Sequence, residues 1–204
     1  KLVLYVFLTM KNIKKPDRRI KRTKNLIKQS LTDLLKEREL QDISITELCD
    51  IADINRKTFY NHFPDIRAVL DEIENENIEK YLAYFKKEDV LSDLTNFYPF
   101  ISRLTTELDQ NNSLSVILNK SDEHLYIKEK IKKQLLVCFN EVFTKNPNID
   151  HETIFFYLDF ITAGIASVYQ EWLLSDKKMS KDKLSKLISE VINNGGKTFI
   201  QALS

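Results

Sequence analysis

Apolar residues recur at spacings of three and four along most of the chain, which is the spacing of one buried face of an α-helix. Only 3 glycines and 4 prolines occur among 204 residues. The prolines stand where the apolar spacing breaks, at Pro16, Pro64, Pro99 and Pro147. This pattern predicts an almost entirely helical, all-α fold.

The amino-terminal part begins with a long helix and a short one. Over roughly residues 18–38, an apolar face is formed by Ile20, Ile27, Leu31, Leu34 and Leu35. Ser44 and Glu47 then have the spacing of a capping box, in which the Ser44 hydroxyl accepts from the Glu47 backbone and the Glu47 carboxylate reaches back to that of Ser44. A short second helix is expected to bury Ile45, Leu48, Cys49 and Ala52.

A tight turn and a third helix follow. Asp53 falls where the chain needs the left-handed conformation, which aspartate tolerates better than most residues. Asn55 is expected to cap a helix from Arg56 to His62. Pro64 is expected to end that helix.

A long fourth helix is predicted over residues 66–87, with Asp65 as its cap. Its apolar stripe consists of Ile66, Val69, Leu70, Ile73, Tyr81, Leu82 and Phe85. Two short helices about a turn, flanked by two long helices, are typical of a helix-turn-helix DNA-binding unit.

The stretch INRKTFYNHFP, residues 54–64, combines core and surface chemistry. Phe59 and Phe63 lie four positions apart and are expected to point, with Ile54, into the small core. The side chains left outside are Arg56, Lys57, Thr58, Tyr60, Asn61 and His62. Such a surface suits the DNA major groove. The alternative is that this helix face is simply solvated. The capped short helix that precedes residues 56–62 favours DNA binding.

Residues 18–70 resemble the amino-terminal DNA-binding domain of the TetR/AcrR family of bacterial transcriptional regulators. The resemblance is carried by SITELCDIADINRKTFYNHFPDIRAVL, residues 44–70. It implies a homodimer on a palindromic operator in double-stranded DNA, with a carboxy-terminal domain that dimerises and usually binds a small effector. The DNA contacts predicted with it are the outer set of residues 56–62 together with Ser44, Thr46 and Arg67.

Two positions depart from the family pattern. Asp53 stands where the family usually has glycine, which places an anion near the DNA. Ile66 replaces a lysine that contacts phosphate in the family, and Arg67 points about 100° away around the helix. These departures leave a rival function open, a helical adaptor or co-regulator that works through a protein partner and binds DNA weakly.

The carboxy-terminal half is acidic and helical, with helices expected over 94–109, 114–120 and 122–145 and two long ones after them. Apolar residues in the last two form a heptad-like seam that we predict to be the dimer interface. Its residues are Ile154, Leu158, Ile161, Ile165, Val168, Trp172, Leu184, Ile188 and Val191. Three glycines in these helices suggest close contacts or a bend. The same seam could instead be buried within one chain.

Aromatic residues are frequent in this half. Residues 155–188 look like the same region of a TetR subgroup that includes activators of dihydroxyacetone kinase operons. An effector pocket could be lined by Phe97, Phe100, Tyr126, Phe139, Phe143 and Tyr157. Aromatic residues at helical spacing are more often plain core.

Charge is unevenly distributed although the net charge is only +1. Residues 1–70 hold 15 Lys and Arg against 9 Asp and Glu, and residues 11–24 hold eight cations against one acid, Asp17. A basic arm of this kind is suited to a polyanion, although a solvated, frayed terminus is as good a reading. The apolar residues 1–9 are too short to span a bilayer and are interpreted as an upstream or expression-derived extension.

Other classes of function find little support in the sequence. The chain has no phosphate-binding glycine motif, and its three histidines have no metal-ligand spacing, so we expect neither an enzyme nor a metal or other cofactor. Cys49 and Cys138 give no disulfide framework, which suits the bacterial cytoplasm. The predicted organisation is a disordered or extraneous arm (1–15), a helix-turn-helix domain (16–70) and a dimerisation and effector domain (71–204), with helix 66–87 connecting the last two.

Overall fold

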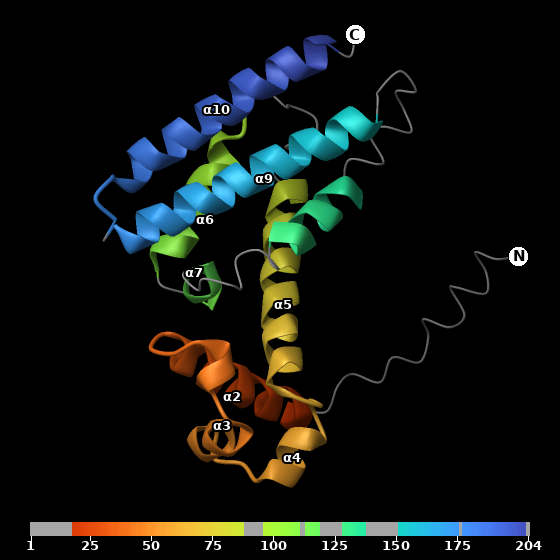
Figure 1. Cartoon of the computed structure of the whole chain (residues 1–204), viewed down its shortest axis with the longest axis vertical. Coiled ribbons are helices and arrows are strands. Elements are labelled where there is room, and N and C mark those ends of the chain that lie inside the picture. The colour runs from red at the N-terminus through yellow and green to blue at the C-terminus, as the bar shows by residue number, and fades with distance from the viewer. Residues whose placement is uncertain are drawn as a thin grey trace, which may run out of the picture. The chain divides into compact units, whose positions relative to one another are not determined.

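The structure is a computed structural model that describes residues 18–87, 96–110, 113–118, 128–137, 151–175 and 177–202, except for the side chains of 84–87, 151, 153–154 and 196–202. The described residues form helices and turns and include no strand (Figure 1), which confirms the all-α fold. The chain divides into two compact units, Lys1–Leu70 and Asp71–Ser204.

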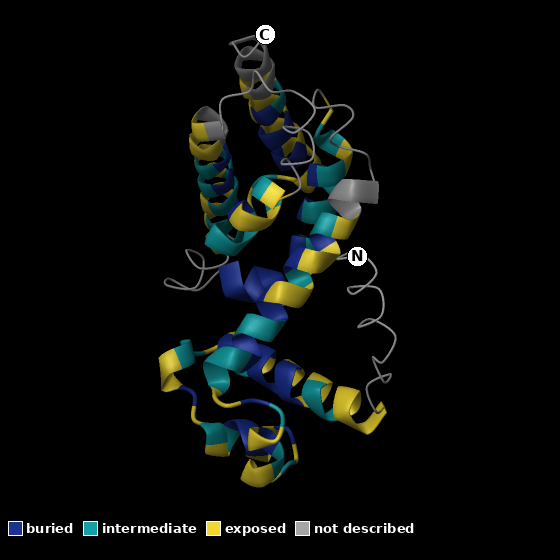
Figure 2. Cartoon of the chain, turned by 90° about the vertical axis from the view of Figure 1, so that its right-hand side faces the viewer, coloured by how far each residue is buried: buried dark blue, intermediate teal, exposed yellow. Residues whose placement is uncertain are grey.

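The described part of the first unit contains α2 (Arg18–Leu35), α3 (Ile45–Ile51) and α4 (Arg56–Tyr60), with a short 3-10 turn at Leu40–Asp42. α3 packs against both α2 and α4. From these three helices, the core of the first unit takes side chains with at most 1% of their surface exposed, which are Ile27, Leu31, Leu35, Leu48 and Phe59. Figure 2 shows buried residues alternating with exposed ones along these helices, as the apolar spacing requires.

Three details of the first unit differ from the prediction. α2 ends at Leu35 and not at residue 38, because the next two amides, those of Lys36 and Glu37, donate to carbonyls only three residues earlier, at 3.3 and 3.2 Å. Ile20 is 44% exposed, since the buried face of α2 begins only at Ile27. α4 is also shorter than predicted, because residues after Tyr60 turn sharply toward Pro64.

The second unit contains most of α5 (Ile66–Lys87), which starts in the first unit. Its other helices are α6 (Tyr98–Asp109), α7 (Ser113–Leu118), a helix over 128–137, α9 (His151–Leu174) and α10 (Lys181–Ala202). α10 packs along α6, and α7 contacts both α6 and α9. α6 begins four residues later than predicted because Pro99 lies in its first turn, where a helix needs no backbone donor.

A buried cluster of three hydroxyl groups joins α6, α9 and α10. Thr105 Oγ1 lies 2.7 Å from the Tyr169 hydroxyl and accepts from Ser185 Oγ at 3.0 Å. Thr105 donates its own hydrogen to the Ile101 carbonyl, which leaves Tyr169 to donate to Thr105. All three side chains are buried, so each polar group in the cluster needs these partners.

Gly164 and Gly195 do not mark the close helix contacts that the sequence suggested as one possibility, and the surroundings of Gly196 lie outside the described residues. A Cβ at Gly164 would meet no other atom within 4 Å, and one at Gly195 would lie 4.0 Å from Tyr157. The helices α9 and α10 are instead connected through α6, which carries Thr105.

Candidate nucleic-acid interface and effector cavity

Local interactions fix the start of α3 and the turn between α3 and α4. Ser44 Oγ accepts from the Glu47 amide at 3.2 Å and so caps α3. The Glu47 carboxylate turns to Arg38 instead of closing the predicted capping box. Asp53 adopts the left-handed conformation with φ 51°, as predicted, and lets the chain reverse between the two helices.

α4 is held from both its end and its inner side. Asn55 caps it as predicted, because its Oδ1 accepts from the Thr58 amide at 2.8 Å. Phe59 and Phe63 are buried, with ring centroids 6.2 Å apart. The Lys24 ammonium lies 4.9 Å from the centre of the Phe63 ring, which adds a cation–π contact from α2.

The outer face of α4 presents the polar side chains that the sequence singled out. Arg56, Lys57, Tyr60 and Asn61 are exposed, while Thr58 and His62 are half-buried. A side-chain hydrogen bond with Tyr60 raises the pKa of Arg56 above its already high value, so the guanidinium stays charged. Of the other predicted DNA contacts, Ser44 and Thr46 are exposed and Arg67 is half-buried.

α2 adds a basic surface to the same unit. Its first three turns carry Arg18, Lys21 and Arg22, which line a shallow concave surface together with Asn25 and Gln29. The sequence counted these cations in the basic stretch 11–24 and also predicted a helix from residue 18, and the structure confirms that they lie on a helix.

The second unit encloses an apolar cavity of about 150 Å³. Its wall is almost wholly carbon and is formed by side chains of α5, α6, α7, α9, α10 and the helix over 128–137. Three predicted pocket residues, Phe97, Phe100 and Tyr157, line the cavity. The other three, Tyr126, Phe139 and Phe143, lie outside the described residues.

The prediction from aromatic residues identified only a small part of the cavity wall. Aliphatic residues such as Leu104, Leu108, Ile161 and Ile165 contribute more of it than the aromatic rings. The sequence offered no signal for this, because an apolar residue beside a cavity and one in a filled core have the same helical spacing.

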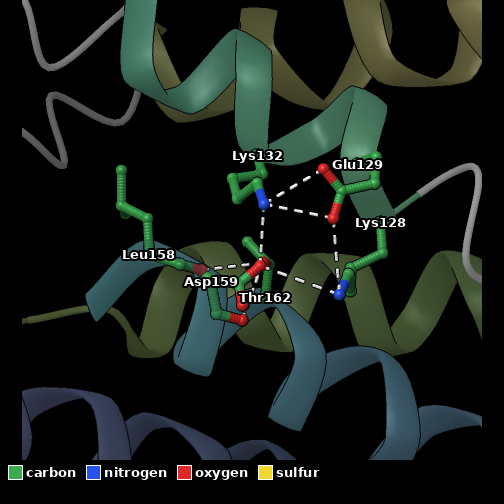
Figure 3. A network of polar contacts seen from close by, with 6 residues as sticks. All are labelled: Lys128, Glu129, Lys132, Leu158, Asp159 and Thr162. Carbon is green, nitrogen blue, oxygen red and sulfur yellow. Dashed lines mark hydrogen bonds and ion pairs between the residues drawn. The ribbon is translucent and has the colours of Figure 1, made fainter. Parts of the chain in front are cut away.

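A polar network lies beside the cavity, between the helix over 128–137 and α9 (Figure 3). Lys132 Nζ contacts Asp159 at 2.8 Å and Glu129 at 3.0 Å. These hydrogen bonds lower the pKa of both carboxyl groups and raise that of Lys132. Lys128 is also in the network, with Nζ at 3.4 Å from Glu129 and 3.7 Å from Asp159. The network fixes the helix over 128–137 on α9.

A second ion-pair cluster connects the same helix to α5. Lys130 Nζ contacts Asp71 Oδ1 at 2.8 Å and also contacts the carboxylate of Glu74, which is fully buried. Burial opposes the charge of Lys130, but the hydrogen bonds with Asp71 and Glu74 outweigh it and raise the pKa. The lysine therefore stays charged and holds the first part of α5.

Much of the predicted dimer seam is used within the chain. Leu158, Trp172, Leu184 and Ile188 are at most 5% exposed, and Ile161 and Ile165 line the cavity. Val168 and Val191 are exposed, and the side chain of Ile154 lies outside the described set. The periodicity identified a buried face correctly, but packing within the unit already covers most of it.

Among the described residues, no group of His, Cys, Asp and Glu could hold a metal ion. None of the helices in the described ranges combines the length and apolar character needed to cross a bilayer.

Residues 95–194 match the family of transcriptional regulator C-terminal regions. No curated protein matches the chain. The match covers the region that contains most of the cavity wall and the hydroxyl cluster.

Solved structures share the fold over nearly the whole chain. A TetR transcriptional regulator from Streptococcus agalactiae is 20% identical, with a TM-score of 0.63, over 86% of this chain and 96% of that one. The fatty acid degradation regulator FadR from Bacillus halodurans is 15% identical, with a TM-score of 0.63, over 85% and 95% of the two chains. The dihydroxyacetone kinase operon activator DhaS is 19% identical, with a TM-score of 0.53, over 87% and 97%. The carboxy-terminal region therefore belongs to the TetR family of transcriptional regulators, and nearly the whole chain shares the fold of a TetR regulator.

Proposed function

We propose that the chain is a sequence-specific regulator that binds a palindromic operator in double-stranded DNA as a homodimer. The observation that carries this proposal is the outer face of α4, where Arg56, Lys57, Tyr60 and Asn61 are exposed above the buried Phe59. Each subunit would place α4 in a major groove, with half-sites about 34–36 Å apart. Such a regulator acts in the bacterial cytoplasm, where its operator lies.

The second subunit would bind the apolar side chains that α9 and α10 leave exposed. Phe156, Phe160 and Val168 follow one another along α9, and Phe160 is 73% exposed. Leu187 and Val191 are exposed one turn apart on α10. Large exposed apolar side chains at helical spacing favour a protein interface. In the proposed dimer interface, these exposed residues take the place of the predicted seam residues that are buried within the chain.

The cavity supports control by a small molecule. A ligand there would contact α5, whose residues Ile78, Tyr81 and Leu82 line the wall and whose amino-terminal end lies in the first unit. The ligand can shift DNA binding only by favouring one of two conformations over the other. A protein partner bound to the second unit could act in the same way.

Tyr60→Ala tests the DNA-reading face. With an operator selected from a random-sequence duplex library, we expect operator affinity to fall about 10- to 100-fold, since one good base or backbone contact contributes about 1–3 kcal/mol. Dimerisation measured by light scattering should not change. Tyr60→Phe, which keeps the ring and removes the hydroxyl, separates packing from hydrogen bonding. Wild-type affinity in Tyr60→Ala would remove this residue from the contact set.

Salt dependence separates the regulator from an adaptor of the same fold. A DNA-binding dimer should lose affinity with salt at a log–log slope near −0.9 per phosphate contacted. The adaptor is favoured by Asp53 and Ile66, which stand near the interface in place of a glycine and a cation in the related family. Failure to select any operator sequence, with only weak binding to all duplexes, would support the adaptor.

A further inference from the structure

The cavity lies wholly within the unit Asp71–Ser204, so its shape depends on one compact body. Its described wall includes Leu104 and Leu108 of α6, Ile161 and Ile165 of α9, and Ile131 of the helix over 128–137. These are aliphatic side chains with no hydrogen-bonding atoms, so a ligand would meet mainly carbon.

The polar residues that reach the wall have their polar atoms engaged elsewhere. Thr162 Oγ1 donates to the Leu158 carbonyl at 2.7 Å. The Tyr169 hydroxyl lies 2.7 Å from Thr105 Oγ1. Figure 3 shows the Lys128 ammonium in the ion-pair network with Glu129 and Asp159, so the residue offers the cavity its carbon stem.

Like Tyr81, Tyr157 brings a phenol to the described wall. Burial raises the pKa of its hydroxyl, so the group stays neutral at physiological pH. A neutral phenol can accommodate an apolar molecule or one weak polar group, but it cannot balance a buried charge.

We propose that this cavity binds a compact, uncharged and mainly apolar molecule, such as a single-ring aromatic or a short branched hydrocarbon. An apolar cavity of about 150 Å³ in another protein stays dry and binds benzene, which indicates a ligand of about six to ten non-hydrogen atoms. A carboxylate would have to be buried against carbon or draw Lys128 away from Asp159 and Glu129. The ligand class follows from the cavity alone. Only the role of that ligand as an effector rests on the proposed function.

Toluene and benzoate provide the test, because they share a ring and differ in charge. Without DNA, we expect toluene to bind the full chain saturably in calorimetry and to raise the melting temperature by about 2–4 °C. Benzoate at the same concentration should do neither. Saturable binding of benzoate, with none of toluene, would overturn the proposal.

Two variants sharpen the test. Ala166→Leu places a larger side chain in the wall and should weaken toluene binding at least about tenfold. Lys128→Met removes the ammonium and keeps a carbon stem in the wall, so toluene should still bind saturably. If the wild type binds benzoate and Lys128→Met does not, the cavity takes acids through Lys128 and the proposal is wrong.

A DNA-binding measurement keeps the two proposals apart. If toluene binds and operator affinity stays the same, the ligand class holds and effector control fails. If toluene fails to bind the wild type while the operator is bound specifically, the ligand class is wrong and the regulator proposal stands.

Discussion

Phe59 supports the proposed DNA-reading face of α4 from behind. Its side chain has no exposed surface, and its ring meets Tyr60 edge-on with centroids 5.5 Å apart. Because α4 has only five residues, it cannot be stable as an isolated helix and depends on this packing.

Phe59→Ala should therefore destabilise the first unit by about 3–5 kcal/mol, through lost apolar burial and the cavity left behind. Urea unfolding followed by circular dichroism measures the change. Tyr60→Ala is the matched control on the same helix and should change stability by less than about 1 kcal/mol, since Tyr60 is half exposed. Equal losses in the two variants would show that α4 is not held by its inner ring.

The single residues that the sequence predicted best are those whose role is local. Ser44 and Asn55 accept the capping hydrogen bonds expected of them, and Asp65 caps α5 by accepting from the Ala68 amide at 2.8 Å. The partner of Glu47 could not be predicted, because Arg38 lies nine residues earlier and only the folded turn brings the two together. Local capping depends on spacing, whereas such an ion pair depends on tertiary structure.

At the scale of elements, the helix over 128–137 forms part of the cavity wall and also makes ion pairs with both α9 and α5. Lys128, Ile131 and Leu135 line the cavity. Lys132 fixes the helix to α9, and Lys130 fixes it to α5. A ligand that displaced this helix would therefore act on α5 directly.

Lys130→Met should destabilise the protein by about 3 kcal/mol, because the buried Glu74 carboxylate loses its ammonium partner. Chemical unfolding at neutral pH measures the loss. Lys133→Met, at an exposed position of the same helix, should have almost no effect. If the two variants were equally stable, the contact with α5 would contribute nothing.

The direction that each helix faces was harder to predict than the helix itself. Apolar spacing correctly indicated α9 and α10, but it could not say whether Leu158 and Ile188 are covered by the same chain or by a second copy. Both kinds of burial remove the same side chains from water and leave the same pattern in the sequence.

At the scale of the whole molecule, the exposed apolar residues of α9 and α10 form the proposed dimer interface. Phe160→Asp should give monomers in light scattering, because a charge would be buried in the proposed interface. Val137→Asp, at an exposed apolar position on the helix over 128–137 and outside the proposed interface, should remain a dimer. A Phe160→Asp protein that stays dimeric would place the interface elsewhere.

The hydroxyl cluster of Thr105, Tyr169 and Ser185 can report changes in the packing of α6, α9 and α10. The phenolic proton of Tyr169 is sheltered from water and held by a neighbouring oxygen at 2.7 Å, so its exchange with solvent should be slow. Such a proton should give a resolved line in a proton NMR spectrum, and the loss of that line would signal the separation of three helices at one observable atom.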